Sequence, residues 1–256
     1  MITRRNYGSG HAYQVNGKPY PGVTTILRQQ AAPALIGWSA RTTAEYAVDN
    51  WDELAGLKVS ERLRLITGAS TSERDAAGRR GTQVHRLAEQ IISLPPGEAE
   101  TVEVPEELAG HVDSYLSFMA DHQPELVVTE LVVCNRRVRY CGSADLVAVI
   151  GGHTWLLEIK TSKGLRSGSA LQACAYQHAE TYTLPGEQGT ERPMSELGID
   201  RAGVVHVRAD GYDLIPLDTG PVTWDYFRRL AWLHYHAEHA ERWVGEAVQP
   251  ARVLAS

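Results

Sequence analysis

The pair Gly151-Gly152 lies between two runs of residues that favour strands, YCGSADLVAVI before it and HTWLLEIK after it. Two glycines in this position are typical of a two-residue hairpin turn, because both turn residues need a positive φ. A turn this short also fixes the register of the two strands. Counting outwards from it, Asp145 faces Glu158 and Ser143 faces Lys160.

Side chains alternate between the two faces of a strand, so this register sorts them by charge. Ser143, Asp145, Glu158 and Lys160 share one face, and the opposite face is largely apolar. Two carboxylates with Cβ atoms about 5 Å apart destabilise a sheet unless a positive charge lies between them. Carboxylate oxygens are ligands that suit Mg²⁺ or Mn²⁺. An ordinary cross-strand charge cluster is the alternative interpretation, and for an isolated hairpin it is the commoner one.

The hairpin lies within a clear succession of helical and strand-like patterns. Apolar residues recur at helical spacing in 35–57, 60–66, 81–94 and 106–122, and three strand-like runs follow residue 125. A helix over 169–182, a hairpin across residues 209–211 and a long helix over about 223–247 complete the pattern. We expect an α/β fold in one domain: a mainly helical region over 1–124, a sheet core over 125–216 and a C-terminal helix over 217–256.

Charge and hydropathy limit the classes of function. The chain has 25 basic and 31 acidic side chains, so any contact with nucleic acid has to be local. The basic candidates for phosphate contact are Arg79, Arg80, Arg136, Arg137, Arg139, Lys163 and Arg166. No run approaches the roughly 20 apolar residues of a membrane span, and the first ten residues lack a secretion signal. We expect a soluble, cytoplasmic protein with no membrane partner.

The three cysteines, Cys134, Cys141 and Cys174, have no Cys-x-x-Cys spacing. This count and spacing argue against a disulfide framework, a zinc ribbon and an iron-sulfur cluster. We expect three reduced thiols and no iron-sulfur cluster.

Five short motifs occur in a particular order along the chain. They are GVTTIL at residues 22–27, GTQVH at 81–85, GSAD at 142–145, EIK at 158–160, and Gln172 with Tyr176 one helical turn later. Together they resemble the PD-(D/E)XK nuclease superfamily in its RecB-like exonuclease branch, which includes the mitochondrial genome maintenance exonucleases and their phage relatives. The resemblance implies a restriction-endonuclease-like α/β core, with a central mixed sheet flanked by helices and an N-terminal helical elaboration.

The resemblance also implies roles for particular residues. Asp145, Glu158, His85 and the main-chain carbonyl of Ile159 would ligate Mg²⁺ or Mn²⁺, and Lys160 would serve the attacking water. Gln172 and Tyr176 would orient Lys160 or touch the DNA strand. Glu130 is a further candidate: if Arg136-Arg137 were a tight turn, Glu130 would face Ser143 and share the carboxylate face.

The activity implied is metal-dependent hydrolysis of DNA phosphodiester bonds, favouring an exonuclease that acts on linear ends, single strands or duplex. Its setting would be recombination, repair or phage genome processing in a bacterial or phage-infected cell, where a recombination protein is a candidate partner. The alternatives are a structure-selective endonuclease with the same site, or a catalytically silent DNA-binding or assembly protein.

Overall fold

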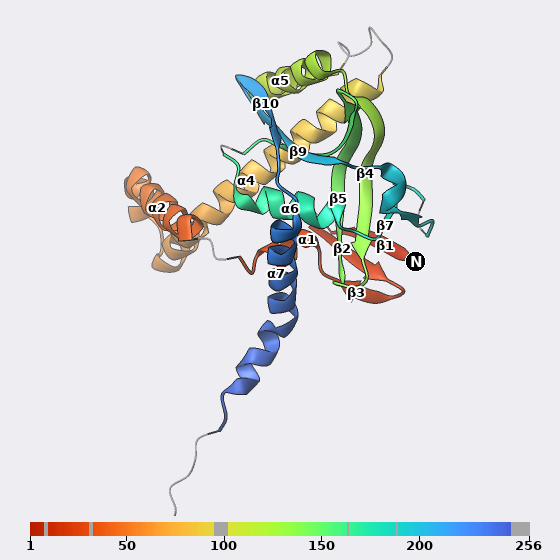
Figure 1. Ribbon diagram of the computed structural model, residues 1–256. Helices are drawn as coiled ribbons and strands as arrows, with labels where there is room; N and C mark the ends of the chain where they lie inside the picture. The colour runs from red at the N-terminus through yellow and green to blue at the C-terminus, as the bar shows by residue number, and fades with distance from the viewer. Residues whose placement is uncertain (8–9, 31–32, 95–101, 163, 188, 247–256) are drawn as a thin grey trace, which may run out of the picture.

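A seven-stranded mixed sheet forms the centre of the computed structural model, which describes all residues except 8–9, 31–32, 95–101, 163, 188 and 247–256. Its strand order is β10-β9-β6-β5-β4-β7-β8. Figure 1 labels β10, β9, β5, β4 and β7 of this sheet. The strands span β4 (Glu125–Asn135), β5 (Tyr140–Ile150), β6 (His153–Lys160), β7 (Thr181–Thr183), β8 (Arg192–Pro193), β9 (Arg201–Arg208) and β10 (Gly211–Pro216). The β6–β9 pair is parallel and the other pairs are antiparallel. The expected α/β fold with a central mixed sheet flanked by helices is confirmed.

Helices cover both faces of this sheet. One face packs on α1 (Val23–Leu27), α6 (Ser167–Gln177) and α7 (Pro221–Ala240) in the largest core cluster. The other face packs on α5 (Glu106–His122) and the C-terminal part of α4 (Val59–Ser93). Because strands covered on both faces have to be apolar throughout, the runs in β5 and β6 are nearly continuous in hydrophobic residues.

The β5–β6 hairpin has the expected register. Its turn is Gly151-Gly152, both with positive φ, and its pairs run from Ile150 with His153 to Leu146 with Leu157. The β9–β10 hairpin across residues 209–211 is also confirmed.

The first twenty residues differ from the helical expectation. They contain a three-stranded antiparallel sheet of β1 (Ile2–Tyr7), β2 (Gly10–Val15) and β3 (Lys18–Tyr20). Ile2, Tyr13 and Val15 of this sheet are buried against β4 and β5. A single apolar residue every second or third position is too weak a pattern to distinguish such short strands from loop.

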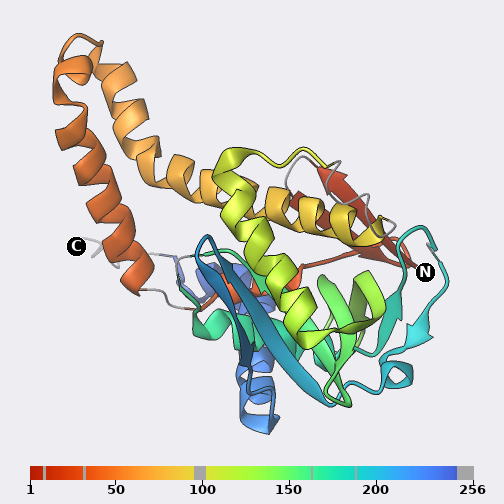
Figure 2. The same ribbon diagram turned by 90° about the horizontal axis from the view of Figure 1, so that it is seen from above.

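A helical arm projects from the body (Figure 2). It consists of α2 (Pro33–Asp49), α3 (Trp51–Ala55) and the N-terminal part of α4. The two helices expected over 60–66 and 81–94 join in α4, which has 35 residues. The intervening segment contains no proline, so no residue in it removes a helical hydrogen bond.

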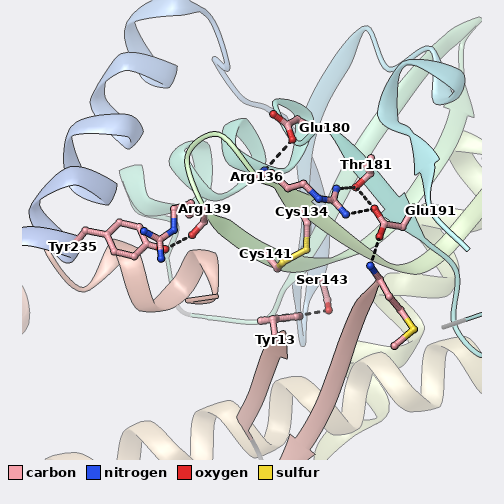
Figure 3. The surroundings of a disulfide bond; sticks show 11 residues. Tyr13, Cys134, Arg136, Arg139, Cys141, Ser143, Glu180, Thr181, Glu191 and Tyr235 are labelled. Atoms are coloured by element: carbon pink, nitrogen blue, oxygen red, sulfur yellow. Dashed lines mark hydrogen bonds and ion pairs between the residues drawn. A yellow bond between two sulfur atoms is a disulfide. The ribbon is translucent and has the colours of Figure 1, made fainter. Parts of the chain in front are cut away.

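Two of the three cysteines form a disulfide, so the expectation of three reduced thiols is wrong. Cys134 and Cys141 are cross-strand partners on β4 and β5 and are bonded to each other (Figure 3). The backbone of each points away from the other: Cys134 accepts from Glu180 N–H, and Cys141 donates to Pro21. Such non-hydrogen-bonded pairs bring Cα atoms closest, here to 4.1 Å. The spacing of the cysteines along the sequence did not predict this disulfide, because the two residues meet through the register of β4 with β5. Cys174 is a free thiol and is buried.

Near the C-terminus, the expected helices are longer than the observed ones. The helix expected over 169–182 ends at Gln177, and β7 follows. The last helix, α7, ends at Ala240, with a short 3₁₀ turn after it, and the final expected residue lies outside the described part of the chain. Among the described helices, none combines the length and apolar character needed to cross a membrane.

Candidate metal and active site

The β5–β6 ladder opens at the two carboxylates that the sequence places face to face. The last backbone pair is Leu146 with Leu157. Beyond it, Ile159 N–H donates to Asp145 Oδ2 at 2.7 Å, and Asp145 N–H points to Glu158 Oε1 at 3.4 Å. Carboxylate oxygens therefore take the place of backbone carbonyls here. The two acidic side chains are held in the gap between the strands by the backbone itself.

The alternation of β5 side chains between the two faces of the sheet is also interrupted at this point. In β5, Ala144 packs in the same core cluster as Val147, although residues three apart should lie on opposite faces. The neighbouring strand explains this, because Glu130, next in register to Asp145, has a φ of 52°. Ser143, which the sequence places on the face of Asp145, contacts Tyr13 of the N-terminal sheet at 3.1 Å (Figure 3).

The β4–β5 connection is also longer than expected. Residues 136–139 form a four-residue turn, not a tight turn of Arg136-Arg137, so Glu130 lies opposite Asp145 instead of Ser143. The candidate glutamate is consequently closer to the carboxylates than the sequence indicated.

Helix α4 brings His85 to the same place. His85 Nε2 lies 2.9 Å from the carbonyl oxygen of Ile159 and 3.8 Å from Asp145 Oδ2. One turn earlier, Gly81 lies against the end of β6, where an added Cβ would be 3.1 Å from Thr161 Oγ1. The glycine of the GTQVH motif thus lets the helix approach the strand closely enough for the imidazole to reach the carboxylates.

Lys160, Gln172 and Tyr176 form a connected network around Glu158. Glu158 is 1% exposed, and its Oε2 accepts from Lys160 Nζ at 2.8 Å and from Gln172 Nε2 at 2.9 Å. Gln172 Nε2 also lies 2.9 Å from the Tyr176 hydroxyl. Gly142 makes room for that ring, since an added Cβ would be 2.3 Å from Tyr176 Cε1. The glycine and the tyrosine of separate motifs are therefore packing partners.

The carboxylates repel one another strongly in this environment. Desolvation, which outweighs the attraction of Lys160, raises the pKa of Asp145 to about 6. Desolvation and the charge of Asp145 raise the pKa of Glu158 to about 7. For Lys160, desolvation favours the neutral amine, but the two carboxylates outweigh it and raise the pKa, so the side chain is an ammonium at neutral pH. The site gathers more negative charge than its one lysine neutralises.

One acidic residue beside the site was missed in the sequence. Desolvation and the neighbouring Glu130 carboxylate raise the pKa of Glu89. Glu89 follows His85 by four residues, so the two share a helix face. That spacing was the available signal, and it gains meaning only once His85 is known to point at the sheet.

A divalent cation fits the donors that converge here. Ligand atoms of His85, Glu130 and Asp145 all lie within 4.8 Å of one another, and the Ile159 carbonyl contacts the same imidazole nitrogen. In this structure His85 Nε2–H donates to the Ile159 carbonyl oxygen at 2.9 Å, so a bound cation would replace this hydrogen bond. Glu158, also expected as a ligand, is instead occupied by Lys160 and Gln172 in this structure.

The basic residues expected to contact phosphate lie in different parts of the structure. At the β4–β5 turn, Arg136 pairs with Glu191 (Figure 3). Arg137 pairs with Glu180. Arg139 lies over the ring of Tyr235. Arg79 and Arg80 are exposed on α4, just before the turn that carries Gly81. Lys163 lies outside the described residues.

No protein-family model and no curated protein matches the chain. Among solved structures, it is similar to the one titled "Crystal structure of SSO0001", with 17% sequence identity and a TM-score of 0.31. That similarity covers 62% of this chain and 71% of the other. A similarity this low says nothing about activity, so function has to be inferred from the residues themselves.

Proposed function

We propose that the protein is a metal-dependent deoxyribonuclease that hydrolyses phosphodiester bonds at the β5–β6 opening. The observation that carries this proposal is the convergence of His85, Glu130 and Asp145 from three elements, with Lys160 held beside them by a buried glutamate. Desolvated carboxylates with raised pKa values are costly to keep together. A function that needs them together accounts for this cost.

His85, Glu130, Asp145 and the Ile159 carbonyl would hold Mg²⁺ or Mn²⁺. When bound, such a cation supplies charge that polarises a phosphate and makes water a stronger nucleophile near neutral pH. Glu158 could join the ligand set if its bonds to Lys160 and Gln172 rearranged. The imidazole ligand favours Mn²⁺ somewhat, because Mg²⁺ prefers oxygen.

The chain's own residues would manage charge and position. Lys160 is an ammonium, so its proton can be donated in a hydrogen bond to the attacking water or to a phosphate oxygen that gains charge. Glu158 fixes the direction of Nζ, and Gln172 fixes Glu158. Tyr176 anchors Gln172 from within the core, so the lysine is positioned by a chain of buried contacts.

The order of the motifs favours DNA ends or single strands as the substrate, as in the RecB-like exonucleases that the sequence resembles. We propose cytoplasmic action in recombination, repair or phage genome processing. The net charge of −6 suits an enzyme that contacts only a short stretch of nucleic acid around its site.

The test is digestion of end-labelled linear DNA, single- and double-stranded, beside circular controls, with Mg²⁺, Mn²⁺ or EDTA. Wild type is compared with Lys160→Ala and Glu158→Ala, and with Arg229→Ala as a control, because Arg229 is exposed on α7 and pairs with Asp225 there. We expect metal-dependent loss of linear DNA alone, abolished in the first two variants. Cutting of circles would make the enzyme an endonuclease. Intact DNA in every condition, with binding retained, would leave a DNA-binding protein.

A further inference from the structure

The N-terminal sheet places an arginine beside the candidate metal site. On β1, Ile2 and Arg4 lie on one face, and their partners on β2 are Val15 and Tyr13. The apolar members of this face are buried against Val132 on β4. The same face continues to Arg4, whose Nη1 lies 3.7 Å from Glu130 Oε2. On β4, Glu130 precedes Val132 by two residues.

The guanidinium of Arg4 is held in one orientation by two neutral neighbours. Its Nε donates to Asn6 Oδ1 at 3.1 Å, and its Nη2 lies 3.2 Å from His11 Nε2 and 3.3 Å from His11 Nδ1. His11 Nδ1 lies 3.1 Å from the same Asn6 oxygen, so its N–H can donate there while Nε2 accepts from arginine. Desolvation and the Arg4 charge lower the pKa of His11, which keeps the ring neutral as this arrangement requires.

The remaining nitrogen, Nη1, has no acceptor at hydrogen-bonding distance within the described residues. Its separation from Glu130 is too long for a hydrogen bond. The Glu130 side chain is 36% exposed, so its charge is reached by solvent and does not need Arg4 as a buried counter-charge. Arg4 itself is 21% exposed, so an anion from solvent can reach the guanidinium. An arginine fork fixed at two nitrogens and open at the third suits a phosphate oxygen.

We propose that Arg4 is a phosphate-binding residue for the DNA strand, contacting a non-bridging oxygen of the phosphate at the site or of its neighbour. The inference rests on the proposed function, since it takes DNA as the ligand. It adds a substrate contact from the N-terminal sheet, which no sequence motif marked. It also gives that sheet a role besides packing against the part of β4 and β5 that carries the disulfide.

The experiment measures DNA binding without metal, so that it does not depend on catalysis. A fluorescein-labelled single-stranded oligonucleotide is titrated with protein in EDTA over a range of salt concentrations, using fluorescence anisotropy. Arg4→Ala and Arg4→Gln remove the charge, and Arg4→Lys keeps the charge without the fork. Arg5→Ala is the control, because Arg5 is exposed on the opposite face of the same strand.

We expect Arg4→Ala and Arg4→Gln to weaken binding by about tenfold and to reduce the salt slope by about 0.7, the value for one phosphate contact on a single strand. Arg4→Lys should restore the slope but not the full affinity. The control variant should bind as wild type does. Thermal unfolding identifies any variant that is not folded, and the glutamine and lysine variants then carry the test.

Titration of Mn²⁺ without DNA separates this role from simple support of Glu130. Unchanged Mn²⁺ affinity in Arg4→Gln, with weakened DNA binding, supports the inference. Weakened Mn²⁺ affinity with unchanged DNA binding would overturn it and make Arg4 a positioning residue for Glu130. Normal DNA binding by every Arg4 variant of a protein that cleaves DNA would also overturn it, leaving the nuclease proposal intact. Binding through Arg4 without any cleavage would refute the nuclease proposal alone.

Discussion

Asp145→Asn should stabilise the metal-free protein while it removes one of the proposed metal ligands. The Asp145 carboxylate is 18% exposed and lies among other acidic groups, and desolvation raises its pKa to about 6 from an ordinary value of 3.8. Its ionised form is therefore less favourable in the folded chain than in the unfolded one. Asparagine removes that charge, and its amide oxygen can still accept the hydrogen bond from Ile159 N–H.

The size of the effect follows from the pKa difference. At about 1.4 kcal/mol for each tenfold change, a rise from 3.8 to about 6 makes the ionised carboxylate cost about 3 kcal/mol at pH 8. Between these two pKa values the folded chain binds more protons than the unfolded chain, so this cost diminishes as the pH falls through 6. By linkage about half of it remains at pH 5 and little at pH 4.

Urea unfolding in EDTA measures this directly at pH 8 and pH 5. We expect Asp145→Asn to raise the free energy of unfolding by about 2 to 3 kcal/mol at pH 8, and by about half as much at pH 5. Asp225→Asn is the matched control, because Asp225 is exposed and its pKa is lowered by bonds to Arg229 and Arg228. That control should not gain stability. A loss of stability in Asp145→Asn at pH 8, or a gain that does not change with pH, would show that the ionised Asp145 carboxylate does not destabilise the folded chain.

Three further outcomes follow from the structure. In differential scanning fluorimetry, Mn²⁺ should raise the Tm of wild type more at pH 8 than at pH 5.5. The reason is that Asp145 must ionise to bind the cation and Glu158 must ionise to hold Lys160. His85→Ala should remove most of that increase in Tm. Gly142→Ala should cost about 1 to 3 kcal/mol in urea unfolding, since its Cβ would collide with Tyr176, whereas Gly37→Ala in α2, with open space around it, should be neutral or stabilising. Replacing Cys134 and Cys141 together by alanine should lower the free energy of unfolding by about 2.5 kcal/mol, the loop-closure value for cysteines seven residues apart. Denatured wild type without reductant should show one free thiol, and three free thiols would contradict the disulfide.

The part of the fold that follows from short-range geometry could be predicted from the sequence. Gly151-Gly152 fixed the β5–β6 register because a two-residue turn permits one pairing, and that register brought Asp145 next to Glu158. Residues 136–139 illustrate the limit. They contain no glycine, their turn has four residues, and Glu130 consequently lies two positions from where a tight turn would put it.

Features that depend on tertiary packing could not be predicted. The change of facing at Glu130 results from a positive φ at a non-glycine residue, for which the sequence carries no clear signal. The disulfide depends on the register of β4 with β5, and spacing rules for cysteines do not contain it. Glu89 and Arg4 become candidates only after α4 and the N-terminal sheet are seen beside the carboxylates. Neither residue belongs to a motif, because each reaches the carboxylates only through an approach between distant segments.

In the proposed reaction, this opening in the sheet holds a divalent cation, and phosphodiester bonds are broken there with the help of Lys160. The most direct measurement is the single-turnover cleavage rate of a 5′-labelled linear oligonucleotide with Mn²⁺, in wild type and in Lys160→Ala. Calorimetry first establishes that both bind the metal. We expect cleavage by wild type, none in EDTA, and a rate at least about 100-fold lower in the variant despite bound Mn²⁺. Intact DNA with Mn²⁺-loaded wild type, or equal rates in the two proteins, would contradict the account.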